Sequence, residues 1–141
     1  MAVDGLVTIR SSYGPEETMN RFEAKVRARG MTAFAHIDYA AGAASVGLSL
    51  RPADLLIFGN ARGSTPLMEL VQTIGIDLPL KALVWQDASG VAWLSYNEPK
   101  WLAMRHGLGP EDAANISVLA VELSQMAQSA TEDGLDPGSS S

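Results

Sequence analysis

The 141-residue chain contains no cysteine, and it is poor in aromatic residues, in cations and in long apolar runs. Without cysteine it can form no disulfide, no thiolate nucleophile and no cysteine-ligated metal site. That absence favours a reducing compartment, so we expect a cytoplasmic protein. No run of about 18 apolar residues is present, so no segment is expected to span a membrane. The start, Met-Ala-Val-Asp-Gly, lacks the basic region and apolar core of a signal peptide.

Cations are scarce, with 10 Lys and Arg against 16 Asp and Glu and a net charge of −6. They are also dispersed, whereas proteins that bind the nucleic-acid backbone need clustered Lys and Arg. We therefore expect no nucleic-acid partner. The two histidines, His36 and His106, are 70 residues apart and have no metal-ligand spacing. The sequence predicts no metal site and no cofactor.

What the chain does contain fits a globular domain, since 47% of its residues are hydrophobic and 18% are charged. Its length is close to the commonest size for one domain. We expect a single domain over residues 1–130. Residues 131–141 read Thr-Glu-Asp-Gly-Leu-Asp-Pro-Gly-Ser-Ser-Ser, a composition that predicts a disordered C-terminal tail.

Prolines and glycines punctuate the predicted helices. Proline suits the first helical position, where its missing N–H would have no partner, and glycine suits the residue after a helix. This pattern predicts helices between Pro15 and Gly30, Pro66 and Gly75, and Pro99 and Gly107, and a last helix from Pro110. The last helix has apolar residues on one face at Ile116, Leu119, Leu123 and Met126.

The predicted strands are short and rich in β-branched or aromatic residues. They are Leu6–Arg10, Thr32–Tyr39, Ser45–Leu50, Asp54–Phe58, Ala82–Gln86 and Val91–Tyr96, the last two joined by a hairpin turn at residues 87–90. Together with the helices they form a β-α-β-β pattern twice. We therefore expect an α+β fold with one six-stranded, mostly antiparallel curved sheet, helices mainly on one face, and a C-terminal helix.

Two strands have apolar residues at consecutive positions, Leu55–Phe58 and Leu83–Trp85. Such runs indicate burial on both faces of the sheet. Either the C-terminal helix or a second subunit must then cover the second face. On this ground we expect a homodimer.

The segment Gly59–Thr65 joins a predicted strand to a predicted helix. A helix start can bind an anion, but the two glycines are four apart and Ser64 stands where a phosphate-binding loop has lysine. Thr65 is a good N-cap for a helix that begins at Pro66. Two readings stay open: a turn that only caps the helix, or a polar-ligand site with Arg62 and Ser64.

Other candidate residues are fewer. His36 and Asp38 share one side of a predicted strand. They could act together as the general base of a hydrolase, or they could be structural. Trp85 and Trp93 are predicted to share a sheet face. Arg51 and Lys81 lie at strand ends, where with Arg62 they could bind an anion or could be solvated.

Several motifs are similar to those of a bacterial and archaeal family known as domain of unknown function 302. They are Arg51-Pro52, Phe58-Gly59-Asn60, Thr65-Pro66-Leu67-Met68, Asp77-Leu78-Pro79-Leu80-Lys81 and Tyr96-Asn97-x-Pro99. The resemblance implies a curved-sheet α+β fold like that of the TATA-binding-protein class, often dimeric, and it implies no activity. Many relatives have histidine at the position of Tyr39. Polar residues in these motifs become candidate ligand-binding residues: Arg51, Asn60, Thr65, Asp77, Lys81, Tyr96 and Asn97.

Three functions follow from these observations. The first is a non-enzymatic homodimeric domain that binds a small polar or anionic ligand near Asn60, Arg62 and Ser64. The second is a hydrolase-like enzyme that uses His36 with Asp38. The third is a protein-interaction scaffold that docks a partner on the second face of the sheet.

Overall fold

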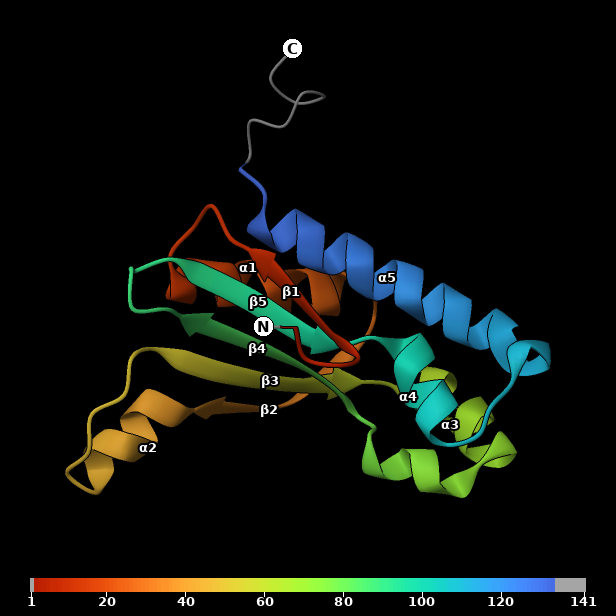
Figure 1. Ribbon diagram of the computed structural model, residues 1–141. Helices are drawn as coiled ribbons and strands as arrows, with labels where there is room; N and C mark the ends of the chain where they lie inside the picture. Colours follow the sequence, from red (N-terminus) through yellow and green to blue (C-terminus); the bar gives the residue numbers. More distant parts are fainter. Residues whose placement is uncertain (1, 134–141) are drawn as a thin grey trace, which may run out of the picture.

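The computed structural model describes residues 2–133, which form one five-stranded antiparallel sheet with helices around it (Figure 1). The strand order across the sheet is β1-β5-β4-β3-β2. The strands are β1 (Leu6–Arg10), β2 (Thr32–Asp38), β3 (Ala53–Gly59), β4 (Leu80–Gln86) and β5 (Ala92–Asn97).

The helices are distributed unevenly around this sheet. They are α1 (Pro15–Ala28), α2 (Tyr39–Ser45), α3 (Ala61–Leu70), α4 (Pro99–Arg105) and α5 (Ala113–Thr131), with 3-10 turns η1 (Gln72–Ile76) and η2 (Pro110–Asp112). Helices α1 and α5 pack against each other over one face. Helices α3 and α4 lie at one end of the sheet, and α2 projects from the other end (Figure 1). The C-terminal helix therefore adds to the first helical layer, and within residues 2–133 it does not cover the second face.

The main core lies between the sheet and the layer of α1 and α5. Phe22 of α1 meets Phe58 of β3 edge to face, with ring centroids 5.3 Å apart. Val84 and Leu94 on the central strands are also fully buried there. A second cluster, formed by Leu67, Ile74, Ala103 and Ile116, fixes α3 and α4 to α5. Full burial of each Val, Leu, Ile or Phe side chain stabilises the fold by about 1.5–3 kcal/mol.

Most of the predicted elements are confirmed. Helix α1 begins at Pro15 and is followed by Gly30, whose φ of 77° is in the left-handed region. Helix α4 begins at Pro99 and is followed by Gly107 with φ 81°. The hairpin between β4 and β5 is present, and Trp85 pairs directly with Trp93, their rings stacked 6.1 Å apart.

The predicted start of the third helix is wrong. Helix α3 begins at Ala61, and Pro66 lies inside it. The N-cap is Asn60, whose side-chain oxygen accepts a hydrogen bond of 2.7 Å from the Gly63 N–H. Asparagine is among the strongest N-cap residues, so it overrides the start that Pro66 indicated. The predicted loop Gly59–Thr65 is therefore mostly the first turns of a helix.

The predicted sixth strand and the repeated β-α-β-β pattern are also wrong. Residues 45–50 form the end of α2 and an irregular return, and β2 pairs directly with β3. The Asp38 carboxylate accepts a 2.9 Å hydrogen bond from the Ala41 N–H and so begins a helix of good helix formers. Val46, Leu48 and Leu50 alternate with small residues as in a strand. Their segment has no neighbouring strand to pair with, because β2 pairs directly with β3.

The boundary of the predicted tail also differs from the structure. Thr131 is the last residue of α5, is almost fully buried, and donates from its hydroxyl to the Ala127 carbonyl oxygen at 2.8 Å. The helix therefore continues past Ala130. Residues 132 and 133 of the predicted tail follow the helix, and residues 134–141 lie outside the described residues.

The capping of α3 gives a test of the fold. Asn60→Ala should lower the free energy of unfolding by about 1 kcal/mol, because the Gly63 N–H loses its partner. Thr65→Ala should change it by less than about 0.5 kcal/mol, because Thr65 is exposed and within the helix. Urea denaturation of both variants measures the difference. A larger loss for Thr65→Ala than for Asn60→Ala would contradict the assigned cap.

Candidate functional site

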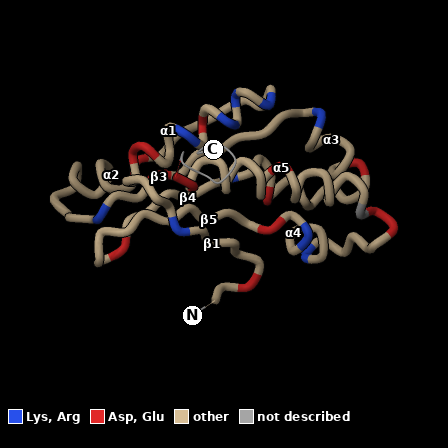
Figure 2. The backbone as a smooth tube through the Cα atoms, turned by 90° about the horizontal axis from the view of Figure 1, so that it is seen from above, with Lys and Arg blue, Asp and Glu red and all other residues tan. Residues whose placement is uncertain are grey.

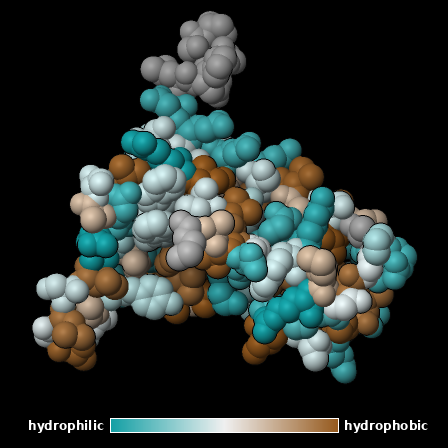
Figure 3. Space-filling view, in the orientation of Figure 1, coloured by the Kyte–Doolittle hydropathy of each residue, from teal (hydrophilic) through white to brown (hydrophobic). Residues whose placement is uncertain are grey.

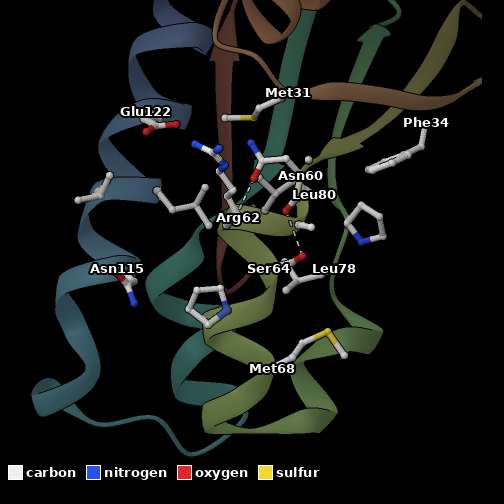
Figure 4. A pocket seen from close by; sticks show the side chains of 17 residues that line it. Met31, Phe34, Asn60, Arg62, Ser64, Met68, Leu78, Leu80, Asn115 and Glu122 are labelled. Atoms are coloured by element: carbon white, nitrogen blue, oxygen red, sulfur yellow. Dashed lines mark hydrogen bonds between the residues drawn. The ribbon is translucent and has the colours of Figure 1, made fainter.

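A cavity of about 540 Å³ lies at the end of the sheet where β3 leads into α3, and α5 forms its opposite wall (Figure 4). Most of its lining is apolar. The main contributors are Met31, Phe34, Met68, Leu80, Val118 and Leu119. Its volume falls within the roughly 300–1,000 Å³ typical of small-molecule sites.

The cavity exists because the chain turns sharply from strand to helix. Gly59 ends β3 with a φ of 153°, a region that favours glycine, and it is buried. A Cβ on Gly59 would lie 3.8 Å from Pro79 and 3.9 Å from the Phe34 ring, so the turn is closely surrounded. The next residue, Asn60, caps α3 and directs its first turn along the cavity.

Polar groups line the cavity from two elements. Asn60, Arg62 and Ser64 come from the start of α3, and Asn115 and Glu122 come from α5. The Arg62 and Glu122 side chains lie in the same part of the cavity (Figure 4). Among the residues described, Arg62 has no ion-pair partner.

The backbone at the start of α3 is also polar. The Gly63 N–H is bound by Asn60, whereas the Ala61 and Arg62 N–H groups have no intrahelical acceptor, because they belong to the first turn. Pro66 has no N–H, so the Arg62 carbonyl oxygen lacks its usual i+4 donor. The cavity can therefore hold the apolar part of a ligand. At the end near the start of α3 it offers hydrogen-bond donors and one guanidinium group.

The structure brings three of the sequence-predicted ligand residues to this cavity, namely Asn60, Arg62 and Ser64. Two of them are linked locally, since the Ser64 hydroxyl donates to the backbone carbonyl oxygen of Asn60 at 3.0 Å. Thr65 is the next residue of α3 but is not part of the lining.

The other predicted residues lie elsewhere. Lys81, Tyr96 and Asn97 contribute to a second, apolar hollow of about 300 Å³ together with residues of β3 to β5. Arg51 donates to the Gln86 carbonyl oxygen at 3.3 Å, beside the far end of β4. Arg51, Arg62 and Lys81 thus do not line one common pocket.

His36 and Asp38 have separate partners. The Asp38 carboxylate caps α2, while His36 Nε2 lies 3.6 Å from the Asp54 carboxylate on the neighbouring strand. Neither His36 nor Asp38 is among the residues that line the two hollows of the described chain.

Asp77 is the centre of a compact polar cluster between η1 and α4. Its carboxylate accepts from His106 Nε2 at 2.6 Å and from Arg105 at 2.7 and 2.9 Å. The other ring nitrogen of His106 lies 2.9 Å from the Thr73 hydroxyl. Burial acts to raise the pKa of Asp77, but the hydrogen bonds and charges of His106 and Arg105 outweigh it and lower that pKa below its ordinary value. The cluster fastens α4 to η1, next to the second core cluster.

Sequence reasoning missed the side of the cavity that α5 forms. Asn115, Val118 and Glu122 are spaced i, i+3 and i+7, so they share one face of α5. The sequence shows this spacing, but it does not show which element faces it. The predicted start of α3 is five residues later in the chain than the observed start. Met31 and Met68 carried no local signal beyond being apolar.

The sheet topology, the helical layer and the cavity together define a small α+β domain. Comparison with known families then identifies it: the family model described as Domain of unknown function DUF302 matches residues 7–134, and the chain belongs to that family. This confirms the resemblance seen in the sequence.

A solved relative confirms the fold. The crystal structure of an uncharacterized conserved DUF302 protein from Bacillus stearothermophilus matches with a TM-score of 0.81 and 18% identity, covering 92% of this chain and all of that one. Identity this low shows a shared fold alone.

The curated relatives are longer proteins. "Fluoride-specific ion channel FluC 1" of Brucella suis biovar 1 (strain 1330) is 50% identical over 105 residues, which are 74% of this chain and 41% of that protein. The protein of the same name from Brucella abortus biovar 1 (strain 9-941) has the same identity over 39% of its length. This chain thus spans about two-fifths of those relatives. Among its described residues, no helix has the length and apolarity needed to cross a membrane, and no three potential metal ligands gather.

The Asp77 cluster gives a test by pH. Because the folded-state pKa of Asp77 is lowered, its contribution is present above its unfolded pKa, near 3.8, and is lost as the pH falls through the folded pKa. Asp77→Asn should lower the free energy of unfolding at pH 7 by about 1–3 kcal/mol, since it removes the charged acceptor.

The variant should also lose less stability than the wild type between pH 5 and pH 2, which urea denaturation at each pH would measure. Glu69→Gln, at an exposed position of α3, is the control and should follow the wild type. Equal acid sensitivity of Asp77→Asn and the wild type would contradict the role given to Asp77.

Proposed function

We propose that the domain binds a small molecule with an apolar body and a single negatively charged end, held in the cavity between α3 and α5. The observation that supports this most directly is the position of Arg62, a cation without an ion-pair partner among the described residues, at a cavity whose lining is mainly apolar. The proposal narrows the polar or anionic ligand expected from the sequence.

The apolar lining favours a ligand with hydrocarbon or aromatic surface. Two methionines, Met31 and Met68, line the cavity with Phe34, and thioether side chains adapt their shape to different occupants. Phe34 is 55% exposed and Val118 is 60% exposed, although both are large apolar side chains. A ligand that covers them gains about 25 cal/mol for each Å² of apolar surface removed from water.

The polar end is suited to one negative charge. Arg62 presents a planar set of donors that matches a carboxylate, and the free N–H groups at the start of α3 add to it. Glu122 lies in the same part of the cavity and repels further negative charge. A monocarboxylate therefore fits better than a phosphate ester with two charges.

Binding is better supported than the two other functions inferred from the sequence. A hydrolase that uses His36 with Asp38 would need both side chains at a cavity, and in the described residues Asp38 is occupied as the cap of α2. A scaffold role would use the open face of the sheet, which is on the other side from the helical layer.

Isothermal titration calorimetry with octanoate as the probe tests the proposal. Arg62→Met should weaken octanoate binding by about tenfold or more, because a charge-assisted hydrogen bond contributes about 1.5–3 kcal/mol. Glu122→Gln should strengthen it several-fold, because a like charge is removed. Arg51→Gln is the matched control, since Arg51 lies away from the cavity, and should leave binding unchanged.

Three further ligands make the test specific. 1-Octanol should bind the wild type and Arg62→Met equally, because it carries no charge. Inorganic phosphate and sodium fluoride should give no heat of binding, because neither has an apolar body. Binding of octanoate that is unaffected by both Arg62→Met and Glu122→Gln, or no binding of octanoate and 1-octanol at all, would contradict the proposal.

A further inference from the structure

Strand β2 is an edge of the sheet that is free along its outer side. It is the last strand in the sheet order, and β3 is its one partner strand among the described residues. Apart from that ladder, the backbone of residues 32–37 takes part in no hydrogen bond within the described chain. Six of the seven residues of β2 are exposed. Such an edge presents a row of N–H and C=O groups that can pair with another chain.

The shape of the molecule leaves this edge accessible. In Figure 1, β2 is the outermost strand, with α2 at one end and the part that contains α3 beyond the other. Figure 3 has the same orientation, and the margin of the molecule is hollowed there between these two projections. An extended chain can therefore approach β2 along its length.

An irregularity in β2 connects the edge to the cavity. Ala33 pairs with Phe58 and Ala35 pairs with Ile57, which leaves Phe34 without a partner residue in the ladder. Bulges of this kind re-aim a side chain and are frequent next to active sites. Phe34 lines the cavity, as does Met31, the residue just before β2. Strand β2 thus begins at the cavity and runs from it towards α2.

The direction of β2 determines which end of an added strand reaches the cavity. Antiparallel pairing is the commoner arrangement and the slightly more stable one for each residue. A chain that pairs with β2 in this way runs from α2 towards Met31 and Phe34, so its C-terminus arrives at the cavity. There Arg62 can bind one carboxylate, and the apolar lining can receive the last side chain.

The far end of β2 carries two acidic residues. Asp38 is aligned with Asp54 across the ladder, and the Asp54 carboxylate lies 3.6 Å from His36 Nε2. The other acidic residues are dispersed over several elements (Figure 2). Opposite charges on directly opposed residues stabilise paired strands. Because β2 has seven residues, an added strand whose last residue lies opposite Thr32 is favoured by a basic residue about six positions earlier.

The other edge of the sheet is less suited to an added strand. Strand β1 has five residues, and α5 packs against it. None of its residues lines the cavity between α3 and α5. Strand β1 therefore serves as the internal control for β2.

We propose that the molecule bound in the cavity is the C-terminus of a polypeptide, which adds to β2 as an antiparallel strand. Its terminal carboxylate lies at Arg62, and its apolar last side chain lies in the cavity. Strand addition gives affinity through backbone hydrogen bonds, while pockets for side chains give specificity. This inference rests on the proposed function and deepens it, because it names the class of molecule that carries the single negative charge.

Isothermal titration calorimetry with the peptide acetyl-Lys-Thr-Ala-Thr-Ala-Val-Leu, with a free carboxylate, tests the proposal. The peptide should bind the wild type at least about tenfold more tightly than octanoate does, because backbone hydrogen bonds add to the contacts in the cavity. Its C-terminal carboxamide should bind at least about tenfold more weakly than the acid. Arg62→Met should weaken the acid to a similar degree and leave the carboxamide unchanged.

N-methylated peptides test the added strand itself. Successive residues of a strand direct their N–H groups to opposite sides, so a methyl group on either of two adjacent nitrogens has different effects. Methylation of the fourth or the fifth residue should weaken binding at least about tenfold in one of the two peptides and leave the other like the parent.

Hydrogen exchange followed by NMR locates the peptide. The peptide should slow exchange of the outward amides among residues 32–37, whereas octanoate should not. Neither ligand should slow the amides of β1. A nitroxide at the peptide's N-terminus should broaden signals of α2 more than those of α3, because the added strand is antiparallel.

Asp54→Asn tests the acidic end of the edge. It should weaken binding of the lysine peptide several-fold and leave octanoate binding unchanged, since Asp54 does not line the cavity. With glutamine in place of the peptide's lysine, Asp54→Asn and the wild type should bind equally. Asp4→Asn, the same change of charge at an exposed position before β1, is the matched control and should bind the lysine peptide like the wild type.

The outcomes separate this inference from the proposed function. Binding of octanoate with no binding of the peptide would overturn the inference and leave the proposed function standing. Absence of binding for octanoate, 1-octanol and the peptide would overturn both. Equal binding of the acid and the carboxamide, equal binding of the two methylated peptides, unchanged exchange in β2, or broadening of α3 instead of α2 would each overturn the inference alone.

Discussion

The packing of α1 against the middle of the sheet is the interaction on which the rest of the structure depends. Phe22 and Phe58 meet in it, and both are completely buried. Once α1 occupies this face, α5 has its longest apolar contact along α1, where Leu123, Met126 and Ala127 are buried. Both long helices therefore share one side. Everything that concerns binding follows from where this layer ends and from what it leaves uncovered.

Two surfaces result from that asymmetry. Helix α5 extends beyond the sheet towards α3, and the second core cluster holds α3 at a distance where the space between them is a cavity. On the other side, the apolar residues Leu55, Ile57 and Leu83 are only partly buried by the described residues. The consecutive apolar residues of these strands predicted burial on both faces, and the cover of the second face stays a prediction. Among the described residues, the fully buried side chains of these two strands all lie on the face towards α1 and α5.

The sequence predicted elements well where one local signal acted alone. Pro15 with Gly30, and Pro99 with Gly107, mark the ends of α1 and α4 because no stronger cap competes nearby. It failed where two signals competed. Asn60 and Pro66 are both start signals, and the side-chain cap prevailed. Around α2, Asp38 capped a run of alanines, whereas the alternation further along favoured a strand that could not find a neighbour. The apolar wall of the cavity depended on the meeting of α3 and α5, which local patterns do not contain.

The misplaced helix start is itself informative about the site. A proline inside a helix removes a hydrogen bond and generally costs about 3 kcal/mol or more, so a chain selected for stability alone would not place Pro66 there. The effect of Pro66 is local, because it removes the donor to the Arg62 carbonyl oxygen. The first N–H groups of the same turn have no intrahelical acceptor. The Arg62 side chain has no ion-pair partner among the described residues. Departures from local rules concentrate at functional sites, since there a polar group without an internal partner can bind a ligand. Both Pro66 and Arg62 line the cavity. Pro66, which led to the wrong helix start, therefore lies in the wall of the candidate site, and it leaves the Arg62 carbonyl oxygen without its usual donor there.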